Sequence, residues 1–153
     1  MDGISEILAT YNCVSLDEKI QFELDGVVEK EIKQAYCIEN LEFCVSCMDY
    51  TTLKVSDTEE SVKNFTADLL KKLKKFNLRD VAAVCVFSNY AGIVREGLKG
   101  TEIQTAVVAG NFPNSQTFTE IKLAECKMAI GAGAQEVDVV ISVGDILEKN
   151  YEK

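Results

Sequence analysis

The sequence predicts an α/β fold built on parallel strands. Apolar segments of strand length alternate with longer segments in which apolar residues recur roughly every three to four positions. The strand segments are apolar throughout, so we expect both faces of the sheet to be covered. Strands that alternate with helices pair in parallel, and each helix crosses over one side of the sheet. Periodicity leaves open whether the sheet is part of a (β/α)8 barrel or an open, doubly wound sheet.

Residues 1–42 are predicted to form a helical extension before the first strand. Within this extension, residues 4 to about 40 are expected to hold two helices with apolar stripes. The second of them begins at Ser15-x-x-Glu18, a pair that satisfies free backbone groups at a helix start. The first carries its apolar residues on one face, at Ile4, Ile7, Leu8 and Tyr11.

Residues 43–153 are predicted to hold four strands with helices between them. The strands are expected at 43–48, 81–87, 103–109 and 136–141. The connecting helices are expected at 56–76, 89–99 and 117–130, with a further helix from Asp145 onward. Gly100 stands at the usual position after a helix end.

Polar residues near the predicted helix starts are interpreted as caps. Ser56-x-x-Glu59 and Thr117-x-x-Glu120 have the spacing of a capping box. Polar residues that follow the strands are interpreted as helix N-caps in the same way. They are Ser88, Asn89, Ser115 and Thr117.

Composition and charge exclude several classes of function. The formal net charge of −9 argues against a nucleic-acid or anionic-membrane partner. The sequence has no basic segment ahead of an apolar run and no apolar run of membrane-spanning length, so we expect a cytoplasmic protein. It contains no histidine, which excludes Ser-His and Cys-His catalytic pairs and histidine-ligated metals. We expect no metal and no cofactor.

The six cysteines are interpreted as reduced, structural thiols. Cys44 and Cys47 form a C-x-x-C pair, but they lie in a predicted strand, where residues three apart point to opposite faces. No second pair follows to complete a zinc site. Burial without a metal is therefore the expected environment of these thiols.

Asp138 is the strongest candidate for acid–base chemistry. It lies in the apolar run VDVVI at 137–141, which is predicted to be a strand buried on both faces. A buried carboxylate is costly unless it is compensated, and such groups collect at functional sites. Asp49 and Cys85 also lie within or at the end of apolar strands. Sites in parallel α/β folds assemble at the carboxyl ends of the strands.

Four motifs together resemble the deoxyribose-phosphate aldolase family. They are CMDYTTL at 47–53, VAAVCVF at 81–87, NFPNSQT at 111–117 and AECKMAIGAGAQEVDVVISVG at 124–144. They occur in the family's order and at its spacing. The resemblance implies the first half of a (β/α)8 barrel, with strands one to four. It also implies reversible cleavage of 2-deoxy-D-ribose 5-phosphate to glyceraldehyde 3-phosphate and acetaldehyde through a lysine Schiff base.

The resemblance assigns roles to four residues. Asp138 matches the family's proton-relaying aspartate on strand four, and Asp49 matches the polar residue that closes strand one. Thr51 matches a threonine that contacts substrate, and Cys85 matches a cysteine that lines the pocket without acting as a nucleophile. The sequence departs from the family at three places, where Tyr50, Phe87-Ser88 and Gln135 replace the usual Leu, Tyr-Pro and Asp.

The family's Schiff-base lysine has no match in this sequence. It lies on strand six in a Lys-Thr-Ser-Thr-Gly run, and its partner lysine and the phosphate site come from later strands and loops. Lys54 lies near the predicted site, and we interpret it as a solvated loop residue. The resemblance therefore implies a chain that is inactive alone and acts on a small phosphorylated sugar or aldehyde when the missing half is supplied.

The alternative is a self-associating α/β scaffold or binding module with vestigial pocket residues. Four strands of an unclosed barrel leave two edges, at 43–48 and 136–141, with unpaired backbone groups. We expect these edges to be buried in an obligate homo-oligomer, and a dimer is the expected form.

Overall fold

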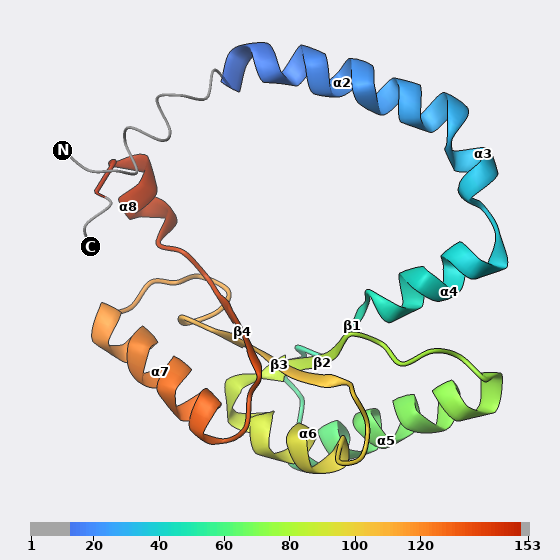
Figure 1. The fold of residues 1–153 in the computed structure, drawn as a ribbon. Coiled ribbons are helices and arrows are strands. Elements are labelled where there is room, and N and C mark those ends of the chain that lie inside the picture. Colours follow the sequence, from blue (N-terminus) through green and yellow to red (C-terminus); the bar gives the residue numbers. More distant parts are fainter. Residues whose placement is uncertain (1–12, 151–153) are drawn as a thin grey trace. The chain divides into compact units, whose positions relative to one another are not determined.

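The computed structural model describes residues 13–150 of the chain (Figure 1). The chain divides between residues 41 and 42 into two compact units. Helices α2 (Cys13–Lys30) and α3 (Ile32–Ala35) precede this division, and α4 (Ile38–Ser46) extends across it. The helix predicted at 4–11 lies outside the described residues.

Four parallel strands form one sheet in the second unit. They are β1 (Asp49–Thr51), β2 (Ala83–Phe87), β3 (Gln104–Ala109) and β4 (Glu136–Val139). Their order in the sheet is β1-β2-β3-β4, and all three pairings are parallel. The predicted parallel α/β fold, preceded by helices, is therefore confirmed.

The first strand is not where the sequence predicted it. The run at 43–48 was expected to be a strand, but it belongs largely to α4, and β1 begins afterwards at Asp49. Leu41, just before this run, recurs at helical spacing with Val45 and Met48 inside it, and Val45 packs against the core. A short apolar run fits a helix as well as a strand, so periodicity alone misassigned it.

The helices between β1 and β4 cover one side of the sheet (Figure 1). They are α5 (Glu59–Phe76), the short 3₁₀ helix η1 (Ser88–Tyr90), α6 (Ala91–Gly97) and α7 (Thr119–Gly131), and α8 (Val143–Leu147) follows β4. An open, doubly wound sheet would place helices on both faces and reverse its strand order. Helices on one side and strands in sequential order are instead the arrangement of a barrel segment.

The helix caps differ from the prediction. Helix α5 is capped by Thr58, whose hydroxyl accepts from the backbone N–H of Ser61 at 3.1 Å. The Ser61 hydroxyl accepts in return from the Thr58 backbone N–H at 2.8 Å, so the capping box lies two residues after the predicted Ser56. The residues at the N-cap positions of η1, α6 and α7 are Phe87, Tyr90 and Phe118, none with a side-chain cap.

Side-chain bonds explain why the predicted caps failed. The Ser88 hydroxyl donates to Glu125 Oε1 on α7 at 2.9 Å, and the Ser115 hydroxyl donates to the Val140 carbonyl at 2.8 Å. These hydroxyls join different elements instead of closing a local turn. Asn89 lies inside η1, and Thr117 precedes the N-cap of α7. The N-cap interpretation of these four residues was therefore wrong.

The core has one layer on each face of the sheet. Beneath the helices, Val84, Val86 and Val107 pack with apolar residues of α5 and α6 such as Val62 and Val94. The opposite face carries smaller buried residues, namely Ala83, Cys85, Ala106 and Val108, with Leu53, Phe87 and Phe112 packed against them. Burial on both faces of β2 and β3 agrees with their continuous apolar sequences.

Gly110 allows β3 to end close to β4. Its φ of +76° lies in the left-handed region, which favours glycine. A Cβ at this position would lie 3.0 Å from Val139 Cγ1 and 3.2 Å from the Val140 carbonyl oxygen. The close approach of the two strands at their carboxyl ends therefore depends on this glycine.

Three of the cysteines differ from the predicted buried state. Cys37, Cys44 and Cys47 are exposed free thiols, whereas Cys85 is buried and Cys126 is partly buried. Cys44 and Cys47 were expected to be buried because the run at 43–48 was assigned to a strand. Among the described residues, no helix is both long and apolar enough to cross a membrane.

Candidate functional site

Three of the sequence-predicted residues lie on the same sheet face as Cys85. Thr51 stands opposite Cys85 in the β1–β2 register, and Asp49 stands opposite Ala83 one row earlier. Val108 stands opposite Asp138 in the β3–β4 register. Alternate residues of a strand point to the same face, so Asp138 lies on the Cys85 face, one row nearer the carboxyl ends.

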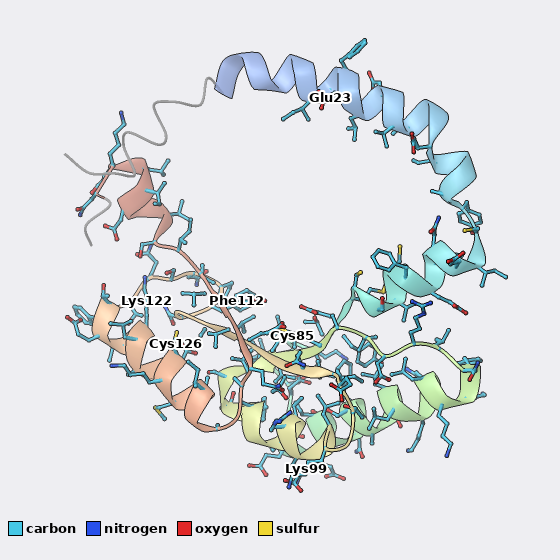
Figure 2. All side chains as sticks on the ribbon, viewed as in Figure 1. Glu23, Cys85, Lys99, Phe112, Lys122 and Cys126 are labelled. Atoms are coloured by element: carbon cyan, nitrogen blue, oxygen red, sulfur yellow. The ribbon has the colours of Figure 1, made fainter. Side chains whose placement is uncertain are left out.

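Electrostatic coupling agrees with this shared face. The pKa of the Cys85 thiol is raised from 9.0 to about 11, and burial is the largest cause. The carboxylates of Asp138, Asp49 and Glu136 raise it further, whereas a hydrogen bond with Thr51 lowers it. The thiol is therefore protonated at neutral pH, which makes it a lining group and a poor nucleophile. Figure 2 shows Cys85 in the middle of the sheet.

The structure corrects the predicted burial of Asp138. Its side chain is exposed, as are those of Glu136 and Val139 on the same strand. Among the described residues β4 pairs with β3 alone and forms one edge of the sheet, as β1 does at the other. The apolar sequence of β4 is typical of a strand that is covered on both faces. Within the described residues, however, no element covers the outer edge of β4.

Glu136 is a member of this face that sequence reasoning missed. It stands opposite Ala106, in the same row as Thr51 and Cys85. Its position two residues before Asp138 was the available signal, because residues two apart on a strand share a face. Asp49, Glu136 and Asp138 therefore give this face three carboxylates.

Asp57 organises the loop after β1 and was also missed. Its Oδ2 accepts from the hydroxyl of Thr52 at 2.8 Å and from the backbone N–H of Lys54 at 2.9 Å. Its carbonyl accepts from the Tyr90 hydroxyl at 2.7 Å. These bonds hold the loop that follows Thr51 at the carboxyl end of β1. The Lys54 side chain is exposed, as predicted from the sequence.

Helix α7 holds the carboxyl ends of the other strands through Glu125 and Lys122. Glu125 accepts from the Ser88 hydroxyl after β2 at 2.9 Å and from the Asn111 backbone N–H after β3 at 3.0 Å. Lys122 donates to the hydroxyls of Ser115 at 2.7 Å and Ser142 at 2.6 Å. Figure 2 shows Lys122 near the N-terminal end of α7. Neither residue was predicted, because each joins elements far apart in the sequence.

An apolar pocket of about 780 Å³ lies between these strand ends and α7. Phe87, Val108 and Phe112 line it from the sheet and the loop after β3, and Ile121 and Met128 line it from α7. Phe87 and Phe112 meet edge to face with ring centroids 6.3 Å apart. Within residues 13–150, no group of three or more His, Cys, Asp or Glu residues is placed to hold a metal ion.

Comparison with known proteins gives a consistent family of relatives. No protein-family model matches the chain. A curated deoxyribose-phosphate aldolase of Clostridium novyi strain NT is 43% identical over 105 residues, which are 69% of this chain and 44% of the relative. One of Clostridium tetani strain Massachusetts / E88 is 40% identical over 105 residues, which are 69% of this chain and 45% of the relative.

Solved structures agree with these sequence matches. A tetrameric deoxyribose phosphate aldolase from Aeropyrum pernix matches with a TM-score of 0.55 and 27% sequence identity, over 67% of this chain and 41% of that chain. The resemblance carried by the four motifs is therefore confirmed. The chain corresponds to the N-terminal half of these proteins and spans a little under half the length of the curated relatives it matches.

Proposed function

We propose that this chain, a homologue of the N-terminal half of deoxyribose-phosphate aldolases, supplies one wall of an aldolase active site. The observation that carries the proposal is the shared face of Asp138 and Cys85 at the carboxyl ends of parallel strands. In parallel barrels this end of the sheet holds the chemistry. The proposed reaction is reversible cleavage of 2-deoxy-D-ribose 5-phosphate to glyceraldehyde 3-phosphate and acetaldehyde.

Asp138 is the proposed proton relay. Its carboxylate is exposed on the edge strand, so a substrate at this face can reach it. Schiff-base formation moves protons from nitrogen to oxygen. Cleavage of the carbon–carbon bond removes a proton from the sugar hydroxyl and later delivers one to carbon. A carboxylate at hydrogen-bond distance can relay such protons. Thr51 and Asp49 are proposed to contact substrate from β1, and protonated Cys85 lines the floor between them.

The Schiff-base lysine is proposed to come from a second half of the barrel, outside residues 1–153. A nucleophilic lysine must be partly deprotonated at neutral pH, which requires burial or a neighbouring cation. Lys54 is exposed in the loop after β1 and does not meet the burial condition. We therefore propose that residues 1–153 alone have no turnover, and that a half with strands five to eight completes the site.

The second candidate function is self-association, and the uncovered edge of β4 favours it. Val139 at the end of β4 and Ile141 two residues later have exposed fractions of 53% and 62%. An edge strand with apolar side chains is a template for pairing with another chain. We propose that, without a second half, two copies bury these edges in a homodimer. We propose a cytoplasmic location for either form, where the exposed thiols of Cys44 and Cys47 would stay reduced.

Complementation tests the aldolase proposal. Residues 1–153 are mixed with a separate chain that carries the remaining half of the Clostridium novyi relative, and acetaldehyde release from 2-deoxyribose 5-phosphate is measured. We expect turnover from the mixture and none from either half alone. Turnover by residues 1–153 alone would contradict the proposed origin of the lysine, and an inactive mixture that forms a stable complex would contradict the aldolase function.

Light scattering tests the self-association proposal. We expect a dimer at micromolar concentration and a shift to monomer or unfolded chain for Val139→Lys, because a lysine at the edge opposes pairing. Val55→Lys is the matched control, since Val55 is fully exposed in the loop after β1. A compact wild-type monomer, or equal effects of the two substitutions, would contradict the dimer.

A further inference from the structure

Lys122 links the two segments that follow the neighbouring strands β3 and β4. Its ammonium group donates to Ser115 in the loop after β3 and to Ser142 in the segment after β4. The Ser115 hydroxyl in turn donates to the Val140 carbonyl at 2.8 Å. Three hydrogen bonds thus link α7, the loop after β3 and the chain just beyond β4. We name Ser115, Lys122 and Ser142 the lysine clamp.

The lysine clamp lies at the carboxyl end of β4, where the β3–β4 ladder ends. The Val140 backbone N–H donates to the Ala109 carbonyl at 3.2 Å, at the end of the β3–β4 ladder. Among the described residues no strand pairs with the outer edge of β4. Val140, directly after β4 and two residues after Asp138, is therefore held to β3 by its N–H and to the lysine clamp by its carbonyl.

Burial, backbone conformation and hydrogen-bonding capacity indicate that the lysine clamp has one fixed geometry. Ser115 is 3% exposed and has a φ of 55°, a left-handed conformation that non-glycine residues rarely adopt. Such a conformation persists where the surroundings over-determine it. A lysine ammonium has three donors and reaches both serine hydroxyls at once. Hydrogen bonds to a charged donor are stronger than those between neutral groups.

We propose that Lys122 is a positioning residue for Asp138. It holds the end of β4 against the loop after β3, and this sets the direction of the Asp138 carboxylate on the Cys85 face. The catalytic meaning of this role rests on the proposed aldolase function, whereas the structural link does not. Lys122 itself touches no reacting atom in the proposed reaction.

Hydrogen exchange on residues 1–153 tests the lysine clamp without any need for activity. In Lys122→Met we expect the Val140 amide to exchange about tenfold faster, the loss expected for a charge-assisted hydrogen bond. The Val86 amide of β2 should keep its wild-type rate. Lys122→Arg should restore protection at Val140, because a guanidinium group also donates to two hydroxyls. Lys127→Met is the matched control, since Lys127 is an exposed lysine on the same helix.

Two outcomes would overturn the proposal. One is an unchanged Val140 exchange rate in Lys122→Met. The other is an equal rise at Val140 and Val86, which would mean that Lys122 supports the fold as a whole. Should Lys122→Met fail to fold, Ser142→Ala removes a single acceptor of the clamp, and the same selective rise at Val140 is expected.

The complemented enzyme adds a readout on catalysis. There, Lys122→Met should lower kcat about tenfold with KM unchanged, because a misdirected Asp138 carboxylate slows proton transfer. Lys122→Arg should recover most of this loss. A rise in KM with kcat unchanged would contradict a role through Asp138. An inactive wild-type mixture that forms a stable complex would refute only the aldolase proposal, because the exchange measurement still decides whether the clamp exists.

Discussion

Val108 and Asp138 stand opposite each other in the β3–β4 register, and this pairing places an exposed carboxylate on the face that buries Cys85. Val108 is 5% exposed in the centre of the sheet, whereas its neighbour on β4 lies at the edge. The same row of the sheet thus passes from a packed core to an open surface. The ionisable side chain lies on the open side.

Asp138→Asn should change the free energy of unfolding of the isolated chain by less than about 0.5 kcal/mol. The carboxylate is exposed, so its charge keeps most of its hydration and the substitution removes no buried interaction. Urea denaturation at neutral pH measures the difference. A change of roughly 2 kcal/mol in either direction would mean that Asp138 is buried or firmly paired in solution.

Cys85 should make the chain less stable as the pH rises from 9 toward 11. The folded-state pKa is about 11 and the ordinary value is 9.0, so between these values the folded chain keeps a proton that the unfolded chain releases. Below pH 9 the thiol is protonated in both states and contributes no pH dependence. Cys85→Ala should flatten this part of the stability curve, measured by urea denaturation at about pH 8 and about pH 10.5, on either side of the ordinary pKa.

The control for this pH dependence is Cys44→Ala. Cys44 is an exposed thiol, so its removal should leave the slope of the wild-type curve in place. If Cys85→Ala and wild type lose stability in parallel across this range, the thiol is not buried in solution.

Gly110→Ala should destabilise the fold by roughly 2 kcal/mol or more. The substitution forces a Cβ onto a positive φ and within 3.0 Å of Val139 Cγ1. Thermal unfolding compares it with Gly131→Ala, where an added Cβ meets nothing within 4 Å at the end of α7. Similar stability of both variants would show that β3 and β4 do not approach closely at their carboxyl ends.

Much of the sheet was predictable because its central strands are long, apolar and flanked by clear helices. The segments VAAVCVF and the run at 103–109 contain β2 and β3, with their ends shifted by one or two residues. The first strand was misassigned because the apolar run before it also fits a helical stripe, and a three-residue strand such as β1 carries almost no periodic signal.

The position of the candidate residues at the carboxyl ends of strands was predictable, but their environment was not. Strand assignment and family motifs led to Asp49, Thr51, Cys85 and Asp138, and the register places all four on one face. The exposure of Asp138 follows from its edge position, which depends on what pairs with β4 and not on the residues around it. Three of the contacts that Lys122 and Glu125 make span 14 to 37 residues of sequence, beyond the reach of any local pattern.

The turnover of Asp138→Asn in the complemented enzyme decides whether Asp138 is the proton relay. Residues 1–153 with this substitution are combined with the remaining half of the Clostridium novyi relative, and kcat for 2-deoxyribose 5-phosphate cleavage is compared with the unsubstituted mixture. Glu102→Gln is the control, since Glu102 is exposed before the amino end of β3. We expect Asp138→Asn to lower kcat by roughly 100-fold or more, the scale of a lost general acid–base group, and Glu102→Gln to leave it unchanged. Equal turnover with Asp138→Asn and without it would contradict the assignment of this chain's chemistry to Asp138.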